Sequence, residues 1–362
     1  MRSAEPEELR EIRAEDEPAL AAFLGSIWPN VAWRERFAAQ WTRNPFAVDQ
    51  PRGFLCASRG EITGCFGSIP MPYRSAAGDV LGFGATALAV RADQRGRGLA
   101  RALVSAWMSC GEAALWVNAT PNAESARLFT QLGFHALDER NAARRGFITG
   151  NPWSSSYRSV QQRLGAVAPL ALPLAWWRAR EQTRRRRTLA ETAKRAQREQ
   201  GLRVERLRWD DARLDELWCA KRESPQLQKR RDVASLRWTF ASSLRAERNL
   251  LLGLVRDRAL IAWAAFREEP ERRRLRMVDA FGALSSVEPF AAVSDAACAE
   301  LAPRDLDHVE LRCGANLATA FQALGLGGEL VRDAAQWWTR EKQLHAPELG
   351  ALDGDRILDV LL

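Results

Sequence analysis

A glycine-rich string between a predicted strand and a predicted helix constrains this chain more than any other feature. The string reads Val90-Arg-Ala-Asp-Gln-Arg-Gly-Arg-Gly-Leu-Ala100. Glycines in such a turn let backbone amides point into one small space, because no Cβ interferes. The helix that follows adds its unpaired first-turn N–H groups and the positive end of its dipole. Together these features predict a cradle for an anion such as pyrophosphate, although a lone Gly-x-Gly also marks many ordinary tight turns.

The residues around this string alternate short apolar runs with amphipathic helical patterns, in the order β-α-α-β-β-β-α-β-α. Strands are favoured by short apolar runs bounded by turn residues, and helices by apolar residues at 3.6-residue spacing. The predicted strands are 8–13, 54–58, 62–70, 80–90 and 114–118, and the predicted helices begin near 18, 33, 99 and 123. Gly133 is a natural end for the last helix.

Two strings in this segment resemble the motifs of the GNAT (N-acetyltransferase) superfamily. Gln94 to Ala100 (QRGRGLA) is similar to its Q/R-x-x-G-x-G/A loop, and Asn122 to Phe134 (NAESARLFTQLGF) is similar to its second motif, an Asn, a helix and a closing Gly-Phe. The resemblance covers about residues 8–150. It implies an acyltransferase that uses acetyl-CoA as co-substrate and no metal, in an α/β (α+β) fold with a mixed, mostly antiparallel sheet flanked by helices.

The same resemblance implies where the co-substrate binds. The edge of strand 85–90 would pair with the pantetheine arm as that strand splays from its neighbour, and a backbone N–H near 88–90 would polarise the thioester carbonyl. The predicted acyl-CoA-binding residues are Leu88, Ala89, Val90, Gln94, Arg95, Gly96, Arg97, Gly98, Leu99, Ala100, Asn122 and Arg127. For the three arginines, phosphate contact and plain solvation are equally good interpretations.

The catalytic acid and base stay unassigned. The Tyr that is usual near the start of the last helix in that family is Phe129 here, which donates no proton. Strand 83–90 contains no carboxylate and no histidine, and Tyr73 and Tyr157 are the only tyrosines in the chain. Ordered water or a group from the other half of the chain could serve instead.

The second half echoes the first. Apolar runs at 250–255 and 260–267 repeat the predicted hairpin of 54–58 and 62–70 at an offset near 197 residues. The run 275–281 corresponds to the predicted strand 80–90. Ser285 to Ala291 (SSVEPFA) stands where the phosphate loop would fall, and its Glu288 would oppose a phosphate. We therefore predict three parts: an acyl-CoA-binding GNAT domain at 1–150, a linker at 151–201 and a degenerate GNAT-like domain at 202–362.

Five polar residues of the second half are weak candidates for lining an acceptor cleft, with solvated loop positions as the better interpretation. They are Glu310, Arg312, Asn316, Asp353 and Asp355.

The predicted linker has two unlike parts. Leu164 to Trp177 carries no charge, and an Arg-rich stretch, 178–200, follows it. Residues 178–208 hold twelve basic and four acidic residues, which accounts for the whole net charge of +8. One hypothesis is peripheral membrane contact through 164–187, with tryptophans at the interface and arginines on anionic headgroups. The preferred alternative is an apolar part packed on a domain and a solvated charged helix or linker, and nucleic-acid binding is disfavoured.

The six cysteines show no C-x-x-C spacing and the chain has three histidines, which favours reduced thiols and no metal site. No apolar N-terminal leader is visible, so we expect a cytoplasmic protein, with the inner face of the cell membrane as the alternative location.

These observations favour an N-acyltransferase, not an aminoacyl transferase, that moves an acetyl group to an amine of a small molecule, amino sugar or peptide. A catalytically silent acyl-CoA-binding protein and a peripheral-membrane acyltransferase of envelope polysaccharide precursors are the alternatives.

Overall fold

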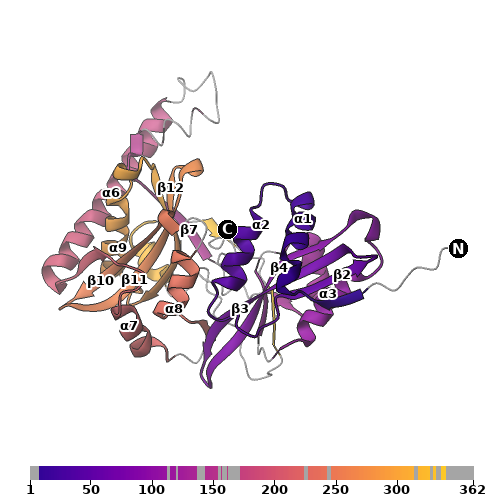
Figure 1. Cartoon of the computed structure of the whole chain (residues 1–362). Helices are drawn as coiled ribbons and strands as arrows, with labels where there is room; N and C mark the ends of the chain where they lie inside the picture. Colours follow the sequence, from indigo (N-terminus) through magenta and orange to yellow (C-terminus); the bar gives the residue numbers. More distant parts are fainter. Residues whose placement is uncertain are drawn as a thin grey trace.

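The computed structural model has two mixed sheets flanked by helices, which confirms the predicted fold class (Figure 1). It describes the chain from residue 8 to residue 339 with several gaps. The described residues are 8–111, 115–119, 121–136, 143–153, 156, 161, 172–223, 227–242, 246–313, 317–326, 329–331 and 336–339.

The first sheet has the strand order β1-β2-β3-β4-β5-β15-β6, in which β4 and β5 are parallel and the other neighbours are antiparallel. Its strands are β1 (Glu8–Glu11), β2 (Gly53–Ser58), β3 (Glu61–Ser75), β4 (Gly78–Val90), β5 (Leu115–Asn118), β6 (His135–Ala136) and β15 (Gln336–Thr339). Its helices are α1 (Glu17–Ile27), α2 (Trp33–Phe37), which continues as one π-helical turn (Ala38–Thr42), α3 (Leu99–Ser109) and α4 (Ala123–Gln131). Short 3-10 turns lie at Ala14–Asp16 and Ala92–Gln94.

The second sheet has the order β8-β10-β11-β12-β13-β7-β14, again with one parallel pair, β12 and β13. Its strands are β8 (Arg203–Arg206), β10 (Asn249–Arg256), β11 (Ala259–Glu269), β12 (Arg274–Gly282), β13 (His308–Cys313), β7 (Ala143–Thr149) and β14 (Glu329–Val331). Its helices are α6 (Leu172–Gln200), α7 (Arg213–Lys221), α8 (Val233–Leu236) with a π-helical turn (Arg237–Ala241), α9 (Val287–Ala299) and α10 (Ala318–Ala323). Three 3-10 turns lie at Ala246–Arg248, Pro270–Arg272 and Ala302–Arg304.

The two sheets exchange one strand each, so the predicted boundaries at 150 and 202 do not separate them. β7 leaves the first half of the chain and inserts between β13 and β14, while β15 returns from the end of the chain and inserts between β5 and β6. The sixth position of each sheet is therefore filled by the other half.

A shared core joins the two halves. Leu227 and Trp238 pack in one buried cluster with residues of β3 and β5, and the Trp238 indole N–H donates to the Ala39 carbonyl (2.9 Å). A short strand, β9 (Gln228–Lys229), pairs with the end of β3.

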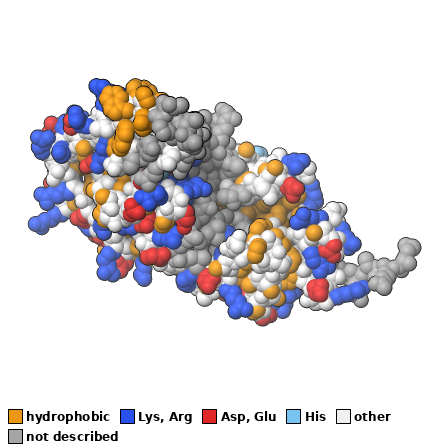
Figure 2. All heavy atoms as spheres, turned by 90° about the horizontal axis from the view of Figure 1, so that it is seen from above, with side chains coloured by type: hydrophobic (Ala, Val, Ile, Leu, Met, Phe, Trp, Pro, Cys, Tyr) orange, Lys and Arg blue, Asp and Glu red, His pale blue; other side chains and the backbone are white. Residues whose placement is uncertain are grey.

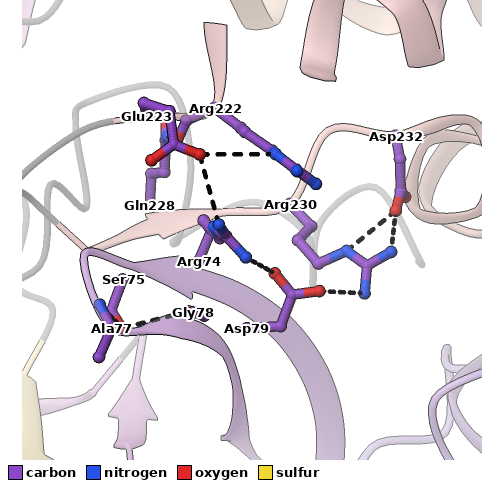
Figure 3. Close-up of polar contacts among 10 residues, drawn as sticks. All are labelled: Arg74, Ser75, Ala77, Gly78, Asp79, Arg222, Glu223, Gln228, Arg230 and Asp232. Carbon is purple, nitrogen blue, oxygen red and sulfur yellow. Dashed lines mark hydrogen bonds and ion pairs between the residues drawn. The ribbon is translucent and has the colours of Figure 1, made fainter. Parts of the chain in front are cut away.

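Ion pairs extend this junction at the surface (Figure 3). Arg74 on β3 contacts Asp79 on β4 at 3.1 Å and Glu223 at 3.4 Å. Asp79 also contacts Arg230 at 3.1 Å, and Arg230 contacts Asp232. These ion pairs therefore connect the β3–β4 hairpin of the first half with residues 223–232 of the second half.

The expected linker is largely a helix of the second sheet. Arg-rich residues 178–200 lie within α6, which packs along α9 with Leu189, Ala193 and Ala196 buried. Arg186 pairs with Asp295 of α9. Pro173 is the second residue of α6 as the structure describes it. Residues 162–171 lie outside the described part of the chain.

We expect the fragments 1–150 and 151–362 not to fold separately, because each lacks a strand that its own sheet requires. Each fragment alone should give a non-cooperative thermal transition by circular dichroism, and co-expression should restore a complex of both on gel filtration. Cooperative folding of the isolated fragment 1–150 would contradict the exchanged topology.

Candidate functional site

A pocket of about 610 Å³ opens where β4, α3 and α4 meet in the first sheet. Its walls are the end of β4, the glycine-rich loop, the first turn of α3 and one face of α4. The lining residues are Ile27, Trp28, Leu88, Ala89, Val90, Gln94, Arg95, Gly96, Gly98, Leu99, Ala100, Arg101, Asn122, Glu124, Ser125, Leu128 and Gln131.

The glycine-rich loop presents uncapped backbone to this pocket. Gly96 and Gly98 have φ of +79° and +83°, a region that L side chains rarely adopt, and a Cβ at either position would meet no atom within 4 Å. Gly98 is the N-cap of α3 and offers no side-chain cap. The first N–H groups of α3 are therefore available to a ligand at the pocket, where the helix dipole favours negative charge.

β4 offers a free edge beside the loop. It pairs with β5 only over Gly82–Gly84. After Gly84, no described strand pairs with the edge of β4 that faces β5. The predicted splaying of strand 85–90 is thus confirmed. On the other side a bulge places Ala87 and Leu88 opposite the single residue Phe66, with Ala87 at φ +51°. An extended ligand could pair with this edge as an added strand does.

The far wall is held by caps and by the exchanged strand. Asn122 is the N-cap of α4, and its Oδ1 accepts from the Ser125 backbone N–H (2.8 Å). Arg101 of α3 donates to Gln131 of α4 (2.8 Å). From β15, Gln336 donates to the Thr130 hydroxyl (2.9 Å) and to the Ala126 carbonyl (3.1 Å). The pocket therefore depends on a strand from the end of the chain.

A recess of about 180 Å³ adjoins the pocket. Trp28, Leu88, Asn122 and Ser125 line both spaces. The other residues that line the recess are Arg36, Phe66, Ala85, Thr86, Ala87, Asn118 and Phe129. None of these described lining residues is a carboxylate or a histidine.

Three buried polar side chains give the recess its chemistry. Arg36 donates to the Thr86 hydroxyl (3.3 Å), and its guanidinium lies 4.9 Å from the centre of the Trp33 ring. The Nδ2 group of Asn118 is buried and has no hydrogen-bond acceptor in the described structure. A buried amide of this kind normally finds a partner, so it is suited to a ligand oxygen. Phe129 is buried among aromatic rings and supplies no hydroxyl.

The acidic residue of the loop is already neutralised. Asp93 accepts from Arg91 (2.7 Å) and from the Gln94 amide (3.0 Å), and the hydrogen bond from Arg91 lowers the pKa of Asp93. Its charge is thus offset where an anion would bind. Glu124 also lines the pocket, as do the basic residues Arg95 and Arg101.

The structure brings ten of the twelve predicted acyl-CoA-binding residues together in the pocket lining; Arg97 and Arg127 are the exceptions. Both of these arginines are exposed, and the Arg127 side chain donates to the carbonyl of Ala123 in its own helix (3.2 Å). Arg95 lines the pocket and donates to the Val90 carbonyl (3.3 Å). Trp28, Arg36, Thr86 and Asn118 were not predicted.

The second half places its candidate residues elsewhere. Glu310 is fully buried and pairs with Arg274 of β12, so it is neither a solvated residue nor a cleft residue. Glu288 lies in the first turn of α9 and pairs with Arg195 (3.4 Å). Arg312 lies on β13, but its side chain, Asn316, Asp353, Asp355 and Tyr157 are outside the described structure. Tyr73 is buried near the β9 junction.

No group of three or more His, Cys, Asp or Glu side chains within the described ranges is placed to hold a metal ion. No described helix is long and apolar enough to cross a bilayer.

Comparison with known proteins assigns a family to one segment of the chain. Residues 7–134 match the model of the acetyltransferase (GNAT) family. Residues 7–134 form a GNAT domain. This match spans the pocket, the loop and α4 of the GNAT domain, and it supports an acyltransferase. No curated protein sequence matches the chain.

Solved structures resemble nearly the whole chain in fold. A GCN5-related N-acetyltransferase from Anabaena variabilis has a TM-score of 0.59 at 13% identity, and a probable N-acyltransferase from Enterococcus faecalis has 0.60 at 10%; each match covers 92% of this chain and 72% of the other. The N-myristoyltransferase of Saccharomyces cerevisiae, solved with bound myristoyl-CoA, has a TM-score of 0.52 at 11% identity, with 98% of this chain and 92% of that chain covered. At these identities the likeness is one of fold.

Proposed function

We propose that this protein is an N-acyltransferase that transfers an acetyl or other short acyl group from coenzyme A to an amine. The observation that carries the proposal is the pocket beside Gly96 and Gly98, where an uncapped helix N-terminus and a free strand edge lie on adjoining walls. The first suits a pyrophosphate and the second an amide-containing arm, and coenzyme A contains both.

The residues present fit this co-substrate without a metal. The loop and the first turn of α3 would hold the pyrophosphate, and the free edge of β4 after Gly84 would pair with the pantetheine. An acyl-CoA supplies the thioester whose acyl group the amine accepts. Ala87 and Leu88, at the bulge, line the recess, and a backbone N–H there would polarise an oxygen bound beside it.

Proton transfer must use groups other than the usual tyrosine. Phe129 occupies that position, and the described recess is lined by the basic Arg36 and by four neutral polar residues, Thr86, Asn118, Asn122 and Ser125. The base that takes the proton from the attacking amine would be a water molecule or another group of the amine substrate. Arg36 and Asn118 are both donors, so they are suited to hold an acyl or acceptor oxygen in place.

The recess volume supports a short acyl group. About 180 Å³ is slightly larger than the roughly 150 Å³ cavity that holds a benzene-sized molecule. A group of a few carbons fits this space and a fatty acyl chain does not.

We expect thiol release to be fastest with acetyl-CoA or a C3–C4 acyl-CoA and to fall by about tenfold or more with octanoyl- and myristoyl-CoA. The assay would measure free thiol with a chain-length series against a panel of an amino sugar, a polyamine and peptide N-termini. Faster turnover with myristoyl-CoA would contradict the size argument. Binding of acetyl-CoA with no thiol release against any amine would favour a silent acyl-CoA-binding protein.

The second half is best explained as a related but degenerate copy. Its strand order matches that of the first sheet position by position, including the single parallel pair and a bulge between the third and fourth strands. Its counterpart of the phosphate loop has no Gly-x-Gly, and the Arg195–Glu288 pair stands at the start of α9. We infer that this half supports the first sheet and does not bind coenzyme A.

A further inference from the structure

The exposed apolar side chains of this protein are concentrated at one place away from the pocket. Of the nine large hydrophobic residues that are exposed in the described structure, five lie at the start of α6 or beside it. They are Trp153, Leu172, Leu174, Trp176 and Trp177, and we call them the α6 patch. Figure 2 shows hydrophobic side chains gathered beside basic ones at the end of the molecule that carries the second sheet.

The helix itself shows why these side chains are exposed. Ala175 and Ala179 are buried on the packing face of α6, which turns Trp176 and Trp177 outward, with 54% and 62% of their surface exposed. Exposing two indoles and two leucines to water is unfavourable, since each would gain about 1.5–3 kcal/mol on burial. A patch of this kind marks an interaction surface.

Basic side chains continue the patch along the same helix. A groove of about 780 Å³ is lined by Trp153, Trp176 and Trp177 at one end and by Arg180, Arg184 and Arg187 toward the other. Arg184 pairs with Glu181 (2.9 Å), whereas Arg180 and Arg187 form no ion pair with any described residue. The Arg180 guanidinium lies 5.5 Å from the centre of the Trp176 ring.

We propose that the α6 patch and its arginines dock this protein on a bilayer that contains anionic lipid. Tryptophans are favoured at the boundary of headgroups and acyl chains, and unpaired arginines complement anionic headgroups. Leu172 and Leu174 distinguish this occupant from a nucleic acid or a saccharide. Indoles stack on bases and sugars, whereas exposed leucines near the start of the described part of α6 are stabilised by transfer from water to an apolar environment such as acyl chains.

Vesicle flotation of the full-length protein tests this proposal. We expect binding to phosphatidylcholine vesicles that contain phosphatidylglycerol, weaker binding to phosphatidylcholine alone, and release at high salt, because salt screens exposed charges. Arg180→Ser with Arg187→Ser should lower the partition coefficient about fivefold for each arginine removed. Trp176→Ser with Trp177→Ser should lower it about tenfold or more.

Two matched controls separate the patch from general basicity and general apolarity. Lys194→Ser with Arg198→Ser removes two exposed basic residues farther along the same helix, and Val48→Ser changes an exposed apolar residue of the first half. Both should float like the unaltered protein. Circular dichroism and thermal melting would verify that each variant is folded, and Trp177→Gln, at the most exposed of these tryptophans, is the single variant that tests the patch if the double variant unfolds.

Three outcomes would overturn the proposal. The first is no flotation with either lipid composition, and the second is equal loss of flotation in the Lys194/Arg198 control. The third is self-association on gel filtration that the tryptophan variants abolish, since the patch would then bind a second copy of the chain.

Discussion

We expect Gly98→Asp to reduce acetyl-CoA affinity by about 100-fold or more. Gly98 stands at the N-cap of α3 with φ of +83°, and its missing side chain faces open space at the pocket. An aspartate there would place a carboxylate against the phosphates and beside the N–H groups that should hold them. At an effective dielectric of about 20, two like charges about 4 Å apart repel by about 4 kcal/mol, and about 2.7 kcal/mol already corresponds to 100-fold in affinity.

Gly60→Asp is the matched control for this variant. Gly60 lies in the turn between β2 and β3 with φ of +78°, and a Cβ there also meets no atom within 4 Å. Both variants therefore carry the same backbone strain of about 1 kcal/mol and the same added charge, at different places. Titration calorimetry should show acetyl-CoA binding for the unaltered protein and Gly60→Asp only.

The two possible failures of this experiment have different meanings. Equal binding by Gly98→Asp and the unaltered protein would place coenzyme A outside the loop. No binding by the folded, unaltered protein would remove the acyltransferase proposal and leave the fold and the α6 patch untouched, because neither depends on the ligand.

The local parts of this site were accessible from the sequence because their information is local. A Gly-x-Gly between a strand and a helix dictates its own backbone, and Asn122 three residues before Ser125 is a helix-capping arrangement. Ten of the twelve residues that the GNAT resemblance implied line one pocket. Arg97 was predicted as part of the loop 94–100 and Arg127 as a phosphate contact, but the sequence does not fix the direction of a long side chain.

The recess residues were missed because they meet only through tertiary packing. Arg36 lies on α2, Thr86 on β4 and Asn118 at the end of β5, and no spacing in the chain relates them. A buried arginine inside an amphipathic helix was the one available signal, since Arg36 stands between Trp33 and Phe37, which are both buried.

The strand exchange was missed for a similar reason. A strand's pattern shows which of its faces is buried but does not identify its neighbour, so the sequence alone places 143–149 at the end of the first domain. The prediction of a linker at 178–200 was wrong for a different reason. Leu189, Ala193 and Ala196 form one narrow apolar stripe along α6. The many arginines around this stripe make it hard to recognise in the sequence.

The second sheet contains a buried charge network centred on Arg274. Arg274 of β12 is buried and pairs with Glu269 of β11 (2.7 Å) and with Glu310 of β13, whose side chain is fully buried. Breaking such a pair leaves a buried carboxylate short of a partner, which costs about 3–5 kcal/mol. We therefore expect Arg274→Met to lower the free energy of unfolding in urea by about that amount.

The preceding residue supplies the control, because Arg273 pairs with Asp305 (2.8 Å) and Asp307 (3.0 Å) at the surface. Arg273→Met should cost no more than about 1 kcal/mol, as exposed ion pairs contribute little. The double variant Arg274→Met with Glu310→Met should recover part of the loss, since it removes the buried carboxylate as well as the arginine. His308 gives a second readout: burial first, and then the nearby Arg274 charge, lower its pKa, so nuclear magnetic resonance should show this pKa rising in Arg274→Met. Equal destabilisation by Arg273→Met and Arg274→Met would show that burial of this network does not govern its contribution to stability.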